Sequence, residues 1–331
     1  MVALNIKLNG STVVFAGKTL TGSVIVHKVI PCKALTLRLL GRGETSWGDG
    51  ESAHHGSCEE YINLKQTLWT YDGGKPLVSG KGYAFGITLP EDLPPTFRGH
   101  YGSIKYVLTA TLECSNPSLD KNSIDSLTVI SFSPVCNVHQ MLLEAQTVKK
   151  EKKINLTCDG CISAKVTLPM SKYVLGESIM IFADVLNRGN VAVKKTTASL
   201  VQTLIYSDGR GSKSERAVIC KVKRGEIAPG MTYAWVSVPL VIPKTISPSD
   251  FGPMCSLFRA EHCVEFTVYI AGIEEKLVFD VTLGTVCGRE PDTNRFVTSY
   301  LKQGSFRVLP FLLNAQEMDA SRTKWMFQRQ R

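Results

Sequence analysis

Some cysteine and histidine residues of this chain have a spacing that could serve redox chemistry or metal binding. Cys158 and Cys161 enclose Asp-Gly in a CxxC motif, which lowers a thiol pKa in redox proteins or supplies two ligands to zinc. Zinc needs two further donors, and the same half of the chain offers Cys255, His262 and Cys263, without ligand-like spacing. The surrounding pattern predicts no thioredoxin-like βαβ unit. Free thiols at a strand start are therefore favoured, and a thiol redox or metal protein is the least favoured alternative.

A second group, His54, His55 and Cys58, lies in a polar segment flanked by glycines. Transition metals bind these residue types, but a solvated hairpin loop is the favoured interpretation. Gly-Lys-Thr at 17–19 lacks the glycine that a P-loop requires at position 12, which is threonine here. The chain has no GxSxG, HExxH or EF-hand pattern, and its carboxylates show no pairing suited to acid–base catalysis. We therefore expect no enzyme, no cofactor and no metal site.

The composition is that of a folded protein. A chain of 331 residues with 44% hydrophobic and 20% charged residues predicts about two globular domains, and it excludes disorder, collagen and coiled coil. No apolar run approaches the roughly 18 residues of a membrane-spanning helix, and the N-terminal sequence lacks a signal-peptide pattern. We expect a soluble, intracellular protein with reduced thiols.

The formal net charge of +9 is unevenly distributed. Residues 1–148 hold 12 basic and 12 acidic residues, whereas residues 149–331 hold 26 and 17. No nucleic-acid-binding module is recognisable, so we expect no nucleic acid partner. A solvated surface is the favoured interpretation of each basic group, and an anionic membrane surface is the functional alternative. The candidate membrane-binding residues are Lys149, Lys150, Lys152, Lys153, Arg322, Lys324, Arg329 and Arg331.

Strands must position these residues, because apolar and polar residues alternate with a period of two along most of the chain. The clearest runs are 35–43, 102–114, 178–186, 263–270 and 276–283, and only 141–153 has helical character. An internal repeat pairs Gly17 with Gly176 and Pro90 with Pro243. The repeat predicts two copies of one β-sandwich, at 1–150 and 155–310, joined by the charged segment near 148–156 and followed by a short basic tail at 311–331.

The segment LPEDLPPTFRGHYGSIKYVLTATLE at 89–113 resembles a signature of arrestin-domain proteins of the α-arrestin type. The resemblance continues in KYVLGESIMIFADVLNRG at 172–189 and spans about residues 10–285. It implies an all-β fold of two tandem immunoglobulin-like sandwiches. The residue types themselves favour a structural role for the signature, because proline fixes φ and the glycines at 99 and 102 permit tight or positive-φ geometry. The signature residues are Pro94, Pro95, Phe97, Gly99, Gly102, Tyr106, Gly176 and Glu177.

The resemblance also implies a function. Arrestin-like proteins are non-enzymatic adaptors that bind cytoplasmic parts of membrane proteins and assist their endocytosis, endosomal sorting or ubiquitination. A cytoplasmic protein, peripheral at the plasma membrane or endosomes, is the corresponding expectation. Many relatives recruit ubiquitin ligases through Pro-Pro-x-Tyr motifs, but Pro94-Pro95 is followed here by Thr96-Phe97. A retromer-like scaffold subunit is the structural alternative to an adaptor.

Overall fold

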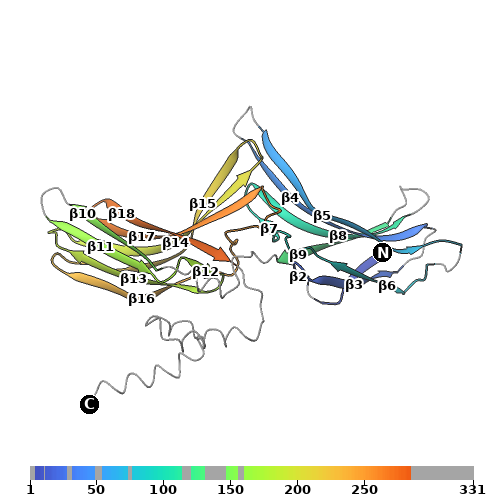
Figure 1. Ribbon diagram of the computed structural model, residues 1–331, viewed down its shortest axis with the longest axis horizontal. Coiled ribbons are helices and arrows are strands. Elements are labelled where there is room, and N and C mark those ends of the chain that lie inside the picture. The colour runs from blue at the N-terminus through green and yellow to red at the C-terminus, as the bar shows by residue number, and fades with distance from the viewer. Residues whose placement is uncertain are drawn as a thin grey trace, which may run out of the picture. The chain divides into compact units, whose positions relative to one another are not determined.

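A computed structural model describes residues 4–10, 12–27, 32–48, 54–73, 77–113, 121–130, 147–155 and 160–284. All of them belong to one compact unit, and they form strands without a single helix. No helix in these ranges could therefore cross a membrane. The strands make two sandwiches, each of two sheets, as the sequence predicted (Figure 1).

The first sandwich is formed by residues 4–130. Its smaller sheet has the order β1-β3-β6, and its larger sheet has the order β2-β9-β8-β4-β5, with β7 paired to β8. The strands are β1 (Leu4–Leu8), β2 (Val13–Phe15), β3 (Thr19–Val26), β4 (Ala34–Gly48), β5 (His54–Thr70), β6 (Gly82–Thr88), β7 (Phe97–Arg98), β8 (Gly102–Glu113) and β9 (Lys121–Ile130).

The second sandwich is formed by residues 148–284. One sheet has the order β10-β11-β13-β16 and the other β12-β18-β17-β14-β15. Their strands are β10 (Val148–Asn155), β11 (Cys161–Leu168), β12 (Lys172–Val174), β13 (Ser178–Asn187), β14 (Val193–Ser207), β15 (Ser212–Arg224), β16 (Thr232–Val241), β17 (Phe258–Ile270) and β18 (Ile273–Gly284).

Alternation along the strands builds both cores, because successive side chains of a strand point to opposite faces. In β8, Ile104, Tyr106, Leu108, Ala110 and Leu112 are buried, while the residues between them are exposed or half-buried. The period-two pattern thus predicted the buried face of this strand correctly.

The internal repeat is confirmed by equivalent hydrogen bonds in the two sandwiches. A short strand, a glycine turn and a long strand follow one another at β2–β3 and again at β12–β13. The N–H of Gly17 donates to the Pro90 carbonyl, and the N–H of Gly176 donates to the Ile242 carbonyl, both at 3.1 Å. Both glycines have positive φ, 76° and 93°, which favours glycine over other residues.

The charged segment near residue 150 differs from its prediction as a linker with helical character. Residues 148–155 form strand β10, which pairs along its whole length with β11. The predicted boundary between 150 and 155 therefore falls inside a strand of the second sandwich. The strand pattern is weak in this segment, because β10 lies at the edge of its sheet and buries only Ile154 fully. Residues 141–146 and the predicted tail at 311–331 lie outside the described residues.

Replacing Gly176 by alanine tests the role of the repeated turn. At φ 93° a Cβ is strained, and it would also lie 2.8 Å from Cε of Lys244. We expect Gly176→Ala to lower the free energy of unfolding by about 1–3 kcal/mol in urea denaturation. Gly225→Ala is the matched control, because a Cβ there meets no atom within 4 Å and φ is not positive. Equal stability of the two variants would contradict the assignment.

Candidate interaction surface between the two sandwiches

An aromatic cluster joins the two sandwiches. Phe97 of β7 lies with its ring centroid 5.1 Å from Phe251 and 5.0 Å from Phe258, both in edge-to-face geometry. Its ring is 6.3 Å from Tyr206 at the end of β14. The hydrophobic core of the first sandwich is therefore continuous with these three residues of the second. Edge-to-face aromatic pairs add favourable energy to the burial of their area, so this contact holds the sandwiches together.

Two signature glycines are required by this contact. A Cβ on Gly99 would lie 2.2 Å from the Tyr206 hydroxyl oxygen, and one on Gly102 would lie 2.7 Å from Cε1 of Phe258. Neither glycine has positive φ. The structure has tight geometry at both positions: the second sandwich approaches both glycines closely, and at Gly102 a Cβ would also lie 2.5 Å from the Glu44 carbonyl oxygen of β4.

The remaining signature residues of this segment are also structural. The Tyr106 hydroxyl donates to the Pro94 carbonyl at 2.7 Å, inside the core. Pro94 is buried and Pro95 is half-buried, as expected from the sequence. The Tyr106 ring fills the space that a Cβ on Gly41 would need, since Cε1 would be 2.4 Å away. The segment thus folds against itself and then against the second sandwich.

Glu177 has the same structural character in the second sandwich. Its carboxylate accepts a hydrogen bond from the N–H of Val174 at 2.9 Å, which closes the turn around Gly176. Burial raises the pKa of Glu177, and the hydrogen bond from Val174 opposes this effect.

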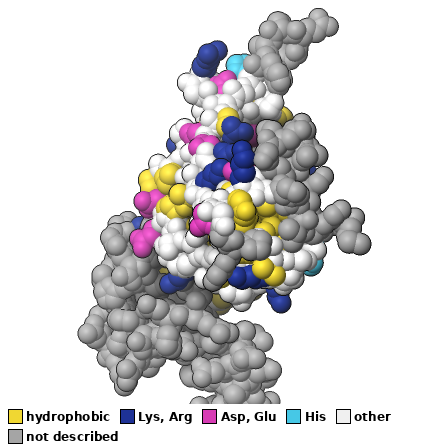
Figure 2. Space-filling view, turned by 90° about the vertical axis from the view of Figure 1, so that its right-hand side faces the viewer, with side chains coloured by type: hydrophobic (Ala, Val, Ile, Leu, Met, Phe, Trp, Pro, Cys, Tyr) yellow, Lys and Arg dark blue, Asp and Glu magenta, His cyan; other side chains and the backbone are white. Residues whose placement is uncertain are grey.

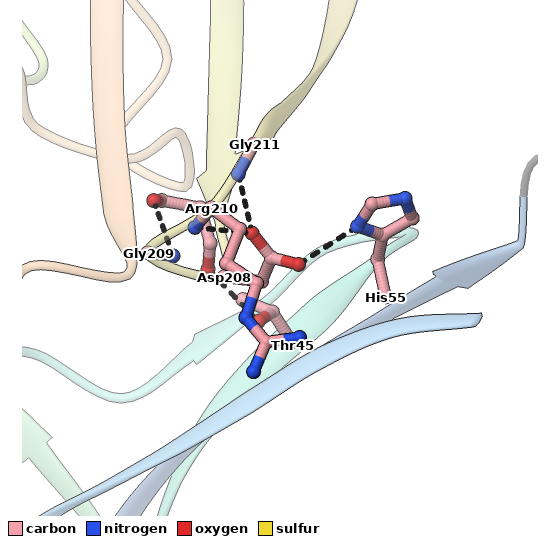
Figure 3. Close-up of polar contacts among 7 residues, drawn as sticks. Thr45, His55, Asp208, Gly209, Arg210 and Gly211 are labelled. Carbon is pink, nitrogen blue, oxygen red and sulfur yellow. Dashed lines mark hydrogen bonds and ion pairs between the residues drawn. The ribbon is translucent and has the colours of Figure 1, made fainter. Parts of the chain in front are cut away.

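A polar contact lies beside the aromatic cluster (Figure 3). The Thr45 hydroxyl donates to the Ser207 carbonyl at 2.9 Å, and Nδ1 of His55 lies 2.8 Å from Oδ2 of Asp208. The other oxygen of Asp208 accepts the N–H groups of Arg210 at 2.8 Å and Gly211 at 2.6 Å. Figure 3 shows His55 reaching this carboxylate from the side opposite to the turn. The tip of the β14–β15 hairpin is therefore tied to the first sandwich.

The charge on Asp208 is stabilised by these donors. The Gly211 N–H is the largest cause, followed by His55 and the Arg210 N–H, and together they lower the pKa of Asp208 to about 2. His55 also stacks on Trp47, with ring centroids 5.4 Å apart. The sequence had favoured a solvated loop for residues 54–58, and this was wrong. These residues begin strand β5, and His55 serves a contact whose partner is 153 positions away.

A further polar group contains Cys255, one of the candidate zinc donors. The Tyr61 hydroxyl lies 2.9 Å from Oε2 of Glu59 and 3.4 Å from Sγ of Cys255. The N–H of Ser256 donates to Glu59 at 3.2 Å. Burial raises the pKa of the Cys255 thiol, so the neutral thiol is the favoured form. Cys255 thus packs at the junction of the two sandwiches.

The other candidate metal ligands do not meet. His262 is buried, and its two ring nitrogens lie 2.9 Å from Nε2 of Gln202 and 2.9 Å from Oγ of Ser249. Cys263 follows it and points to the opposite face of β17. Cys161 is a half-buried free thiol at the start of β11, and Cys158 lies outside the described residues. Within the described ranges, no three histidine, cysteine or acidic side chains are grouped so that they could hold a metal ion.

The four lysines of β10 are divided between two faces. Lys150 donates to the Val278 carbonyl and lies 5.4 Å from the Phe279 ring centroid, while Lys152 pairs with Glu275 at 2.5 Å. Both therefore connect β10 to β18 across the edge of the sandwich. Lys149 and Lys153 alternate to the other face and are exposed. The sequence had grouped the four lysines, and the strand separates them.

Basic side chains do not form one continuous patch on the face seen in Figure 2. Lys and Arg side chains gather there in small groups, with Asp and Glu side chains and hydrophobic side chains between them. The four predicted basic residues of the tail, Arg322, Lys324, Arg329 and Arg331, lie outside the described residues.

A hollow of ≈ 410 Å³ lies at the same junction. Its lining includes Arg98 and His100 of the first sandwich and Gln202, Leu204, Glu215 and Ala217 of the second. The Tyr206 hydroxyl fixes one side of it, because it accepts the His100 N–H at 3.2 Å and donates to Glu215 at 3.1 Å. Burial, followed by Glu215, raises the pKa of Tyr206 to about 12. The hollow has no signal in the sequence, since its residues share no motif and come from segments about 100 positions apart.

Comparison with known proteins gives matches over both sandwiches. Residues 4–134 match the family model of the arrestin (or S-antigen) N-terminal domain, and residues 158–287 match that of the C-terminal domain. Arrestin domain-containing protein 4 of Mus musculus is 28% identical over 290 residues, which cover 82% of this chain and 68% of that protein. Arrestin domain-containing protein 17 of Caenorhabditis elegans is 27% identical over 278 residues, covering 77% and 64%. Arrestin domain-containing protein 1 of Homo sapiens is 24% identical over 288 residues, covering 84% and 63%.

The buried histidine predicts a specific pH dependence of stability. Burial lowers the pKa of His262 to about 4, whereas an unfolded histidine titrates near 6.5. Between these values the unfolded chain binds a proton that the folded chain does not, so the free energy of unfolding should fall as the pH falls from 6.5 to 4. The slope should reach about 1.4 kcal/mol per pH unit.

Urea denaturation at several pH values measures this slope. We expect His262→Gln to lose it and the exposed His27→Gln control to keep it. The same slope in His262→Gln and in the unchanged protein would contradict the assignment.

Proposed function

We propose that this chain, which belongs to the arrestin-domain-containing (α-arrestin) family, is a non-enzymatic adaptor that binds cytoplasmic parts of membrane proteins. It assists their endocytosis, endosomal sorting or ubiquitination, and it works in the cytoplasm at the plasma membrane or endosomes. The observation that carries the proposal is the presence of both arrestin domains, in order, at residues 4–134 and 158–287.

The junction between the sandwiches supports a binding role. Aromatic packing at Phe97 and the hydrogen bonds of Thr45 and Asp208 connect elements far apart in the sequence. A surface formed in this way has a defined shape before a partner arrives, which reduces the entropy lost on binding. Cytoplasmic tails are extended peptides, and such peptides bind to strand edges and to the grooves beside them.

Recruitment of a ubiquitin ligase needs a route other than the proline pair of this chain. Pro94 is buried and its carbonyl accepts the Tyr106 hydroxyl, so this segment is occupied by the fold. We propose that ligase or trafficking machinery reaches the cargo through another protein bound to the adaptor.

Capture of cargo from cells tests the proposal. The tagged full chain, expressed in cells and isolated after mild crosslinking, should enrich membrane proteins and trafficking or ubiquitin-ligase components. An unrelated cytoplasmic β-sandwich protein with the same tag is the control. Size-exclusion chromatography of native lysate should show the chain over a range of sizes, because adaptors exchange partners. No enrichment of membrane proteins, or elution wholly in one large complex, would reject the adaptor in favour of a fixed scaffold subunit.

Contact with an anionic membrane is the second part of the proposal, and the two faces of β10 allow a matched test. Lys149→Gln with Lys153→Gln removes two exposed charges, whereas Lys150→Gln with Lys152→Gln removes two that are tied to β18. We expect the first pair to weaken binding to phosphatidylserine liposomes about tenfold or more, at about 1 kcal/mol per lysine near the surface. The second pair should bind nearly as the unchanged chain does. Equal effects of the two pairs would remove this face from the membrane contact.

A further inference from the structure

We infer that the hollow at the junction is a docking site for an extended, acidic peptide segment that lies along β15 and places a carboxylate at Arg98. The inference rests on the proposed function and names the class of ligand for one surface. The volume of the hollow, ≈ 410 Å³, lies within the range of ligand sites, and such sites are common at domain interfaces.

Arg98 is the charged group in the lining of the hollow that would attract a carboxylate. Arg98 is exposed and forms no ion pair with any of the described residues. On the opposite wall, the carboxylate of Glu215 already accepts the Tyr206 hydroxyl at 3.1 Å. The amide nitrogen of Gln202 is engaged by the Ser247 carbonyl at 3.3 Å and by His262 at 2.9 Å. The guanidinium of Arg98 is therefore the charged donor left for a ligand, and it binds carboxylates in a bidentate manner.

Strand β15 explains why the ligand is an extended peptide. Among the described strands it is the edge of its sheet and pairs with β14 alone, so backbone N–H and C=O groups on its other side could pair with an added strand. Glu215 and Ala217 of β15 line the hollow at alternate positions. Side chains of an added strand would alternate in the same way, so every second one could enter the hollow.

The charge of β15 explains why the peptide is acidic. The strand carries five basic residues and one acidic residue; Arg216 is paired with Glu265 at 2.5 Å, and the other four basic residues make the strand complementary to negative charge. The five basic residues are Lys213, Arg216, Lys221, Lys223 and Arg224, and the acidic one is Glu215.

The wall that carries Arg98 is fixed in place before a ligand binds. Gly99 packs on the Tyr206 hydroxyl, the His100 N–H donates to it, and Phe97 is held in the aromatic cluster. Arg98 therefore projects from a rigid two-residue strand, and little ordering of the backbone is needed on binding.

Fluorescent heptapeptide pools test this site on the full chain. The pools are random at six positions and have Glu, Gln or Lys at the centre, with acetylated and amidated ends, and binding is followed by fluorescence anisotropy. We expect the Glu pool to bind at least about fivefold more tightly than the Lys pool, and its binding to weaken with salt. Arg98→Glu should abolish the preference, and Arg98→Lys should retain part of it.

Lys165→Glu is the matched control, because it reverses an exposed charge on β11, which lies in the other sheet of the second sandwich and does not line the hollow. Equal thermal unfolding midpoints of Arg98→Glu and the unchanged chain would establish that the variant is folded. No binding by any pool, an equal affinity for the Glu and Lys pools, or a preference that survives Arg98→Glu would overturn the inference. If the unchanged chain captures membrane proteins from cells but shows no preference for the Glu pool, this site alone is rejected. If the unchanged chain captures no membrane proteins, the proposed function is rejected.

Discussion

The packing of Phe97 against Tyr206, Phe251 and Phe258 is the contact on which the rest of the junction depends. Each sandwich has its own hydrophobic core, but the core of the first includes buried residues of the second. Burial of large aromatic side chains is among the strongest favourable terms available to a protein. Separation of the sandwiches would expose these rings to water, so the aromatic contact opposes it.

The polar contacts around this cluster depend on it in turn. The pairs Thr45–Ser207, His55–Asp208 and Glu59–Ser256 each join residues more than 150 positions apart. Hydrogen bonds formed in exchange for bonds to water contribute little each, so they could not bring such distant segments together. They define the geometry once the aromatic residues have brought the sandwiches into contact. The hollow lined by Arg98 and Glu215 exists because of the same contact.

The position of a basic residue within its strand, rather than its neighbours in the sequence, determines which face its charge lies on. The excess positive charge belongs to residues 149–331, but within β10 alternate lysines perform different tasks. Lysines on the edge strands β10 and β15 also discourage pairing with the edge of another sheet. The same basic residues on β15 would attract an acidic peptide. Positive charge would thus both discourage pairing with other sheets and select the partner that binds.

The fold could be predicted from the sequence to a large extent. Local alternation determines which residues of a strand such as β8 are buried, and the positive φ at Gly17 and Gly176 shows why glycine occupies both copies of the repeated turn. Two predictions did not hold: a linker at 148–156 and a loop at 54–58. Both segments are strands made mostly of charged or polar residues. A strand at the edge of a sheet buries few residues, so its apolar signal is weak.

The interaction surface was decided by tertiary structure. Nothing near His55 in the sequence indicates Asp208, and nothing near Arg98 indicates Glu215, because these residues meet only when two sandwiches pack. Local sequence determined the strands, since alternation and turn conformation act over a few residues. Packing between distant segments decided the surface, since contact there depends on how two complete cores fit together.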